Sequence, residues 1–299
     1  MSFERYLDEE SIQALQDTVL FSECLKKDCN NGSVFPAIRQ NRVDFYHKGG
    51  RLFSWEKGDS KGFSTHHKYA SVIHGQKDDY ITDAALENRE IRLISSFFEG
   101  YERIKENCSL YSGLESSGVS ALYHGFSCAI KKLQEVSVLD IEIAFATEDS
   151  FGERKSNDRI DFVTIDRAGK LRFFEAKHYS NRASLRCDNG IPQLYSQLSK
   201  YDGYLKKFES AILGSYTKHV SAIMDLFDVD VPMPQSIDPV TKAIIFGFDN
   251  EQRHYLNKNI MQVKDKDEIF LLKNRTYTIG DITKADLPTL FRGGKQNWE

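Results

Sequence analysis

Two carboxylates and a lysine lie close together in one segment of the chain, Asp158–Lys177, with the sequence DRIDFVTIDRAGKLRFFEAK. Successive side chains of a β-strand alternate between its two faces, so Glu175 and Lys177 share a face if the segment is extended. Carboxylate oxygens suit a hard cation such as Mg²⁺, and a lysine beside them can hold a phosphate oxygen or orient a water for attack. Asp161, Glu175 and Lys177 therefore outline a site for phosphodiester cleavage.

The same segment predicts the hairpin that would carry these groups. Its pattern indicates one strand over Ile160–Ile165 and a second over Lys170–Lys177. The turn between them, Asp166–Gly169, ends in a glycine, which tolerates the positive φ that such turns often need. We therefore expect the two carboxylates and the ammonium group to converge on one point.

Two environments are open for these three charges. On the wet face of an antiparallel hairpin they would pair across the strands for a fraction of a kcal/mol. The neighbouring residues favour burial instead, because apolar side chains occupy both faces of the strands: Phe162, Val163, Ile165, Phe173 and Phe174. Buried charges are costly without a metal or a partner, so this pattern favours a functional site over a solvated surface.

Three motifs, in this order, resemble the core of the PD-(D/E)XK nuclease superfamily, above all its restriction-endonuclease-like and RecB-like branches. They are Ile160–Val163, Glu175–Lys177 and the helix-like segment Pro192–Tyr201. In that family an aspartate opens the central hairpin, a Glu-x-Lys closes it, and a following helix often carries Gln-x-x-x-Tyr, matched here by Gln197 and Tyr201. The resemblance covers roughly residues 110 to 250 and says little about the first hundred.

The resemblance implies both a fold and a set of roles. The fold is α/β (α+β), a restriction-endonuclease-like mixed sheet flanked by helices, with the buried segment Lys242–Phe248 as its fourth strand. Asp161 and Glu175 would bind Mg²⁺ or Mn²⁺, and Lys177 would assist the attacking water or stabilise charge in the transition state. An amide and a phenol on one helical face, Gln197 and Tyr201, would position that lysine or a nucleic-acid backbone.

The family adds a further glutamate from the helix that opens its core, and this sequence does not single it out. Helical spacing predicts one helix over Asp83–Glu106 and another from Ser116 or Ser120 to Gln134. Glu115, near the start of the second helix, ranks first and is taken as the third metal ligand. The alternatives that stay open are Glu90, Glu99, Glu135 and, on a strand expected over Leu139–Thr147, Glu142.

Candidates for nucleic-acid contacts flank this core. Arg182 and Arg186 lie between Lys177 and a helix expected over Pro192–Ile212, and are the nearest phosphate clamps. A second hairpin is predicted over Arg42–Trp55, after an amphipathic helix within Phe3–Lys27. Its interleaved basic and aromatic residues suit nucleic acid, with Lys48 and Arg51 as contacts. The preferred alternative is a small sheet with a solvated basic face and an aromatic core.

Bulk properties set wider limits. With 299 residues and 40% hydrophobic composition, the chain can form one large or two modest domains. We expect an N-terminal accessory region over residues 1–80 and a nuclease-like domain over residues 81–299. The net charge of −4 gives no global basic field, so nucleic acid must be held by a local patch or by metal-bridged phosphates.

The sequence predicts no membrane association, because it has neither an apolar run of transmembrane length nor a signal peptide, and we expect a cytoplasmic protein. The predicted function is a metal-dependent nuclease acting on DNA in preference to RNA, in a setting of restriction, defence or repair suggested by the resemblance alone. The alternative is a nucleic-acid- or protein-binding factor that keeps the fold without cleaving. Either is compatible with an oligomer or a protein partner.

Overall fold

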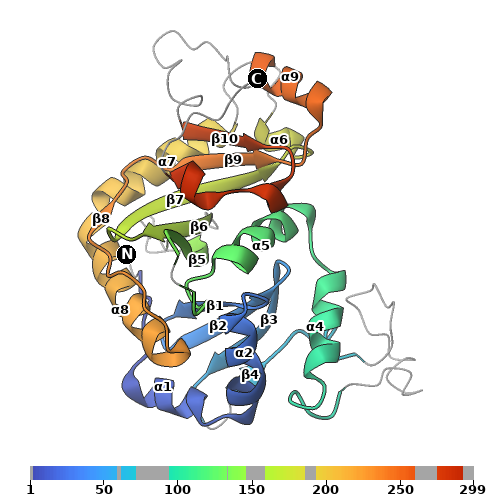
Figure 1. The fold of residues 1–299 in the computed structure, drawn as a ribbon, viewed down its shortest axis with the longest axis vertical. Coiled ribbons are helices and arrows are strands. Elements are labelled where there is room, and N and C mark those ends of the chain that lie inside the picture. The colour runs from blue at the N-terminus through green and yellow to red at the C-terminus, as the bar shows by residue number, and fades with distance from the viewer. Residues whose placement is uncertain are drawn as a thin grey trace, which may run out of the picture.

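The computed structural model describes residues 3–58, 62–71, 94–132, 134–145, 159–185, 193–259 and 275–291. Over these residues the protein is a mixed α/β structure with two β-sheets (Figure 1). Its helices are α1 (Glu9–Gln16), the π-helix η1 (Phe21–Leu25), α2 (Lys26–Asn30), α4 (Tyr101–Leu110), α5 (Leu114–Phe126), α6 (Arg182–Leu185), α7 (Gln193–Lys207), α8 (Glu209–Phe227), α9 (Asn250–Asn259), the 3₁₀ helix η2 (Ile282–Lys284) and α11 (Leu287–Phe291).

The larger sheet contains the predicted hairpin at its centre. Its strands run in the order β10 (Thr276–Ile279), β9 (Lys242–Phe246), β7 (Lys170–His178), β6 (Arg159–Asp166) and β5 (Val136–Ala144), and the short β8 (Ser236–Ile237) also pairs with β7. Neighbouring strands from β5 to β7 are antiparallel, whereas β7, β9 and β10 are parallel. The sheet is therefore mixed, and the expected strand at Lys242 follows the helices α7 and α8 as predicted.

The turn of the central hairpin depends on its glycine. Gly169 has a φ of +73°, and a Cβ there would lie 2.2 Å from the carbonyl oxygen of Met233. Asp166 supports the turn by accepting hydrogen bonds at 2.9 Å from the backbone N–H groups of Ala168 and Lys170. The predicted strands and turn are confirmed.

Helices cover both faces of the larger sheet, because alternate strand residues are apolar on both sides. Val163, Ile165 and Phe173 belong to the buried cluster that also contains Tyr216 and Ile223 of α8. On the opposite face, a second cluster joins Phe162, Phe174 and Ala176 to Val119 and Leu122 of α5. The sheet thus lies between α5 and α8.

Three expected helices have different boundaries. The helix predicted to reach Gln134 is α5, which ends at Phe126 because Ser127 forms a bridge with β5. The helix predicted over Pro192–Ile212 is broken at Phe208, whose φ of −118° and ψ of 19° separate α7 from α8. Of the helix predicted over Asp83–Glu106, residues 83–93 lie outside the described residues, and α4 begins only at Tyr101, after a turn.

The N-terminal region forms a four-stranded antiparallel sheet rather than a lone hairpin. The strands β1 (Phe35–Arg39), β2 (Arg42–His47), β3 (Gly50–Glu56) and β4 (Gly62–Ser64) are neighbours in this order. The aromatic side chains of Phe45, Phe53 and Trp55 are buried and so cannot stack on bases. The aromatic core of the preferred alternative is therefore confirmed, whereas the role of the basic face stays a prediction.

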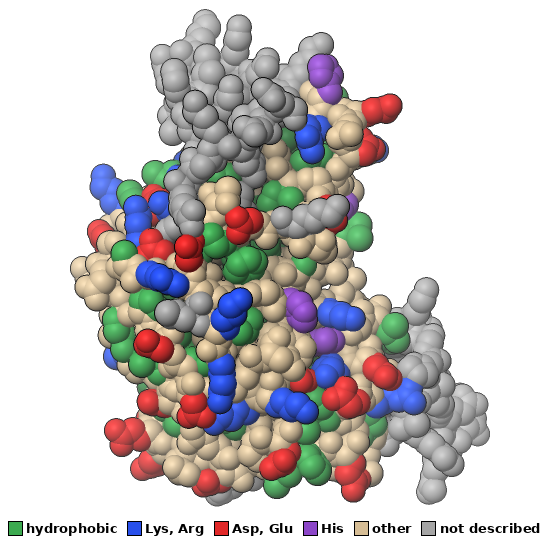
Figure 2. Space-filling model, in the orientation of Figure 1, with side chains coloured by type: hydrophobic (Ala, Val, Ile, Leu, Met, Phe, Trp, Pro, Cys, Tyr) green, Lys and Arg blue, Asp and Glu red, His purple; other side chains and the backbone are tan. Residues whose placement is uncertain are grey.

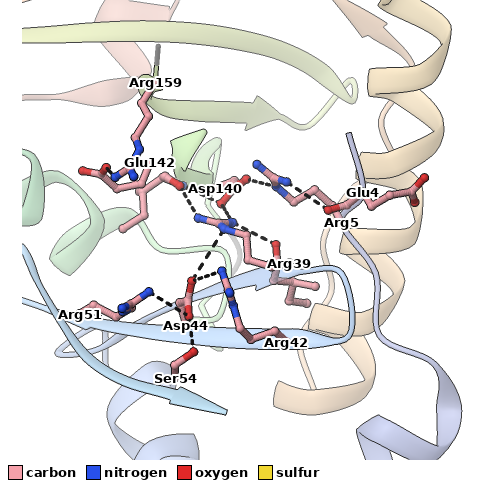
Figure 3. A network of polar contacts seen from close by, with 12 residues as sticks. Glu4, Arg5, Arg39, Arg42, Asp44, Arg51, Ser54, Asp140, Glu142 and Arg159 are labelled. Atoms are coloured by element: carbon pink, nitrogen blue, oxygen red, sulfur yellow. Dashed lines mark hydrogen bonds and ion pairs between the residues drawn. The ribbon is translucent and has the colours of Figure 1, made fainter. Parts of the chain in front are cut away.

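The N-terminal sheet is joined to the larger sheet by apolar packing and by buried ion pairs. Asp140 of β5 is fully buried and accepts hydrogen bonds from Arg5 Nε at 2.9 Å and from Arg39 at 2.7 Å (Figure 3). Burial alone would raise the pKa of Asp140, yet the two guanidinium groups lower it to about 2. One apolar cluster also contains residues of both regions, and the division near residue 80 stays a prediction.

Basic and acidic side chains are interspersed over the face shown in Figure 2, without one sign covering it. Among the described helices, none combines the length and the apolar character needed to cross a lipid bilayer.

Candidate functional site

The candidate site begins where the two central strands separate. The paired residues of β6 and β7 end at Phe162 and Phe174. One residue earlier, the carboxylate of Asp161 accepts a hydrogen bond from the backbone N–H of Ala176, with 2.6 Å between Oδ2 and N. A side chain thus takes the place of a backbone acceptor, which fixes the Asp161 carboxylate against the end of β7.

Glu175 and Lys177 form a buried ion pair on β7. Only 1% of Glu175 and 7% of Lys177 is exposed, and Lys177 Nζ lies 2.6 Å from Glu175 Oε1. The alternative of a solvated hairpin is therefore wrong. On the side away from β6, β7 pairs with β9, where Glu175 lies opposite Ala243 and Lys177 opposite Ile245, so the backbone of both residues is held by β9.

Glu115, in the first turn of α5, is the third carboxylate at this point. Its Oε1 lies 3.3 Å from Lys177 Nζ, and its Oε2 accepts from Asn181 Nδ2 at 3.2 Å. The helix reaches this position because it lacks a side chain at Gly118, where a Cβ would lie 2.2 Å from the ring of Phe246 on β9. The structure thus brings Glu115 to Lys177, as ranked first from the sequence.

Gln197 and Tyr201 extend the network from α7. Gln197 Nε2 donates to Glu175 Oε1 at 2.7 Å and to the Tyr201 hydroxyl oxygen at 2.8 Å. The Tyr201 hydroxyl in turn donates to the backbone carbonyl of Arg159, at the start of β6, at 2.8 Å. Because the two side chains are four residues apart on one helix face, they connect Glu175 to the strand that carries Asp161.

Carboxylates that share one buried site repel one another, and the pKa values of this cluster show that effect. Burial, followed by repulsion from Glu175, raises the pKa of Asp161 well above its usual value. Burial also raises the pKa of Glu175 to about 7, although the Lys177 ammonium opposes the change. For Lys177, burial disfavours the charge, but attraction to Glu175 and Asp161 outweighs it and the pKa rises. A bound cation would relieve this repulsion.

A cleft of about 270 Å³ opens beside the cluster. Three carboxylates line it, Glu115, Glu142 and Asp161. Its other walls come from the N-terminal sheet and from α5, and include Tyr46, Gly49, Ser116, Val119 and Tyr123. The cleft therefore connects these carboxylates to the exterior.

The site offers donor atoms of the kind that a divalent cation prefers, but the carboxylates that the structure describes are not grouped around one position for a metal ion. Carboxylate oxygens suit Mg²⁺, and the Oε2 atom of Glu175 is buried with no hydrogen-bond partner among the described residues. However, in the part of the chain that the structure describes, no three His, Cys, Asp or Glu residues are grouped so as to hold a metal ion. The Lys177 ammonium lies between Glu115 and Glu175 instead.

The remaining candidates lie outside this hydrogen-bonded network of described residues. Lys48 is exposed in the turn between β2 and β3, Arg51 is exposed on β3, and Arg182 is exposed at the start of α6. Arg186 and Glu90 fall outside the described residues. Lys48 lies close to the network, because its backbone carbonyl accepts a hydrogen bond from Ser112, just before α5.

Sequence reasoning did not assign a role to Asn181, and it included Tyr46 only as one of the aromatic residues interleaved with basic ones in the Arg42–Trp55 hairpin. Asn181 follows the carboxyl end of β7, a place where polar side chains commonly meet a site, and that position was the available signal. The sequence did not single out Tyr46 among these aromatic residues, because its place in the cleft wall depends on how the N-terminal sheet packs against α5.

Comparisons of this chain with protein-family models, with curated proteins and with solved structures gave no match.

Proposed function

We propose that this protein is a metal-dependent nuclease that hydrolyses phosphodiester bonds, with DNA as the preferred substrate. The observation that carries the proposal is the buried contact of Lys177 with two carboxylates, Glu175 at 2.6 Å and Glu115 at 3.3 Å, next to Asp161. Such a charged group is expensive to bury, and a structural role would be served as well by apolar residues of similar size.

The order of the elements supports the restriction-endonuclease-like part of the proposal. A helix, α5, precedes three antiparallel strands, β5 to β7, and the helices α7 and α8 lead to β9, which is parallel to β7. In this order Asp161 stands at the start of the second strand and Glu175 and Lys177 stand at the end of the third. This is the arrangement implied by the resemblance to PD-(D/E)XK nucleases.

In the proposed reaction a bound Mg²⁺ or Mn²⁺ would polarise the scissile phosphate and lower the pKa of a bound water. Asp161, Glu175 and Glu115 would hold the cation. Lys177 would stabilise negative charge that develops on the phosphate, since a buried ammonium is worth more there than in water. Gln197 would keep the Glu175 carboxylate in place, and Tyr201 would anchor Gln197 to β6.

One observation favours the second candidate function, a binding factor without cleavage. Lys177 already balances the charge of Glu115 and Glu175, and no metal-binding group of three residues exists in the described ranges. A protein that only binds nucleic acid or another protein could keep these ion pairs as part of its core.

Cleavage assays with Asp161→Asn distinguish the two functions. This substitution keeps an acceptor for the N–H of Ala176 but removes the charge, so we expect the fold to remain and cleavage of plasmid, linear and single-stranded DNA in Mg²⁺ or Mn²⁺ to be lost. Asp225→Asn, an exposed aspartate on α8, is the matched control and should cleave like the wild type. Wild-type protein that cleaves none of these substrates in either metal would leave the binding function, and full activity of Asp161→Asn would refute the site.

A further inference from the structure

The N-terminal sheet turns its polar face toward the cleft. Residues of β2 alternate, so Val43 and Phe45 enter the buried cluster with α1 and α4, while Arg42, Asp44 and Tyr46 occupy the other face. Across the sheet, Arg51 pairs with Tyr46 and shares its face. Tyr46 itself lines the cleft together with Asp161. This face is therefore part of the route to the candidate site.

Arginines and carboxylates form a network beside this route. Figure 3 shows five arginines and three interacting carboxylates in one network, namely Arg5, Arg39, Arg42, Arg51 and Arg159 with Asp44, Asp140 and Glu142. Glu4 takes part through its backbone carbonyl only.

Two of these arginines have exposed side chains next to residues that line the cleft. The side chain of Arg51 is 56% exposed, and its nearest carboxylate oxygen, on Asp44, lies 4.0 Å away. The side chain of Arg159 is 60% exposed and lies 3.1 Å from Glu142, which lines the cleft. Guanidinium groups recognise phosphates, so the mouth suits a polyanion.

The cleft is narrow, and the contact that forms one of its walls is tight. Gly49, in the turn after Tyr46, donates its N–H to the Tyr123 hydroxyl oxygen at 3.0 Å. It has a φ of +85°, and a Cβ there would lie 2.6 Å from the backbone carbonyl of Ser116. The N-terminal sheet thus rests on the backbone of α5. The volume of about 270 Å³ is below the usual range of small-molecule pockets, about 300–1,000 Å³, and so is too small to take in a duplex segment.

We infer that the cleft takes an unpaired polynucleotide strand, led in by Arg51 and Arg159, with a base stacked on Tyr46. The inference rests on the proposed function for the identity of the ligand, and it adds that the substrate must be single-stranded at the point of attack. Phosphates pair with the two arginines, and the half-buried tyrosine ring offers a π-face that any base can use. An intact duplex does not reach Asp161 through this cleft.

Binding without divalent metal tests the inference apart from cleavage. We would measure the Kd of fluorescent oligothymidylate and of a blunt oligo(dA)·oligo(dT) duplex of equal length, over a range of salt. The wild type should bind the single strand at least about tenfold more tightly. Arg51→Gln combined with Arg159→Gln should weaken this binding at least about tenfold and lower the salt slope by about 1.4, since each phosphate contact on a single strand contributes about 0.7.

Matched variants separate a specific role from a loss of charge or of fold. Arg167→Gln removes the same charge from an exposed arginine in the turn at the other end of the β6–β7 hairpin, and it should bind like the wild type. Tyr46→Leu should weaken single-strand binding at least about fivefold, whereas Tyr46→Phe should retain it, because stacking on an aromatic ring is worth about 1–3 kcal/mol per base. Thermal unfolding of each variant reports its folding.

The outcomes for binding and for cleavage are distinct. Equal affinity for single strand and duplex, no affinity for either, or no effect of the Arg51 and Arg159 substitutions would overturn the inference even if the protein cleaves DNA. Single-strand binding that depends on both arginines, without cleavage in Mg²⁺ or Mn²⁺, would keep the strand site and remove the nuclease proposal.

Discussion

The substitution Lys177→Met distinguishes a buried, functional lysine from a surface lysine, because the two predict different losses in the free energy of unfolding. Lys177 Nζ and Glu175 Oε1 are 2.6 Å apart, and the side chains are 8% and 1% exposed. At an effective dielectric constant of about 20, the attraction over this distance is about 6 kcal/mol, and much of it offsets the cost of burying both charges. Loss of one partner leaves the Glu175 carboxylate uncompensated, which typically costs about 3–5 kcal/mol, whereas a surface pair costs less than about 1 kcal/mol.

Urea denaturation at about pH 9, above the folded pKa of Glu175 of about 7, measures this cost. We expect Lys177→Met to lower the free energy of unfolding by about 3–5 kcal/mol and Lys177→Met with Glu175→Gln to recover most of the loss, because the double variant has no uncompensated buried charge. Glu175→Gln keeps an oxygen that accepts from Gln197. A loss below about 1 kcal/mol in the single variant would show that the pair is not buried as described.

Single-turnover cleavage at saturating Mg²⁺ tests the catalytic role in the single Lys177 variants. If Lys177 stabilises the transition state, Lys177→Met, assayed where urea denaturation shows it to be folded, should cleave about 10²-fold more slowly or worse, while its DNA binding in Ca²⁺ stays near that of the wild type. Lys177→Arg keeps the charge but changes its shape and reach, so it should not restore the rate. Wild-type rates in the folded variants would refute the catalytic assignment.

Two further predictions concern pH. Glu175 has a folded pKa of about 7, above its ordinary value of 4.5, so between these pH values the folded protein binds a proton that the unfolded chain does not. The free energy of unfolding should therefore fall as pH rises from about 4.5 to 7, by on the order of 3 kcal/mol. Glu175→Gln should flatten this part of a profile of urea midpoint against pH, and an unchanged profile would contradict the assignment. Asp140 has a lowered pKa of about 2, so its contribution is present above its ordinary value of 3.8 and is lost as pH falls toward 2, by about 2 kcal/mol. Asp140→Asn should therefore lower stability at neutral pH and reduce its decline in acid, as followed by circular dichroism.

The sequence alone determined the local elements of the candidate site. The β6–β7 hairpin follows from alternating residues and from a glycine that the turn requires, and both are properties of neighbouring residues. The Gln-x-x-x-Tyr spacing likewise placed Gln197 and Tyr201 on one face of a helix. Local periodicity does not mark where a helix stops when the cause is a contact with another element, and so the sequence does not predict the end of α5 at the bridge between Ser127 and β5.

The tertiary structure decided which distant groups meet. Glu115 lies 62 positions before Lys177 and contacts it because Gly118 allows α5 to pack against Phe246. Among the candidate carboxylates, only such packing could select it, since each had a suitable charge and a suitable local setting. Arg5 reaches Asp140 across 135 positions for the same reason. Propensity acts over a few residues, whereas these contacts depend on how buried apolar faces fit together, and that fit also places the N-terminal sheet beside Asp161.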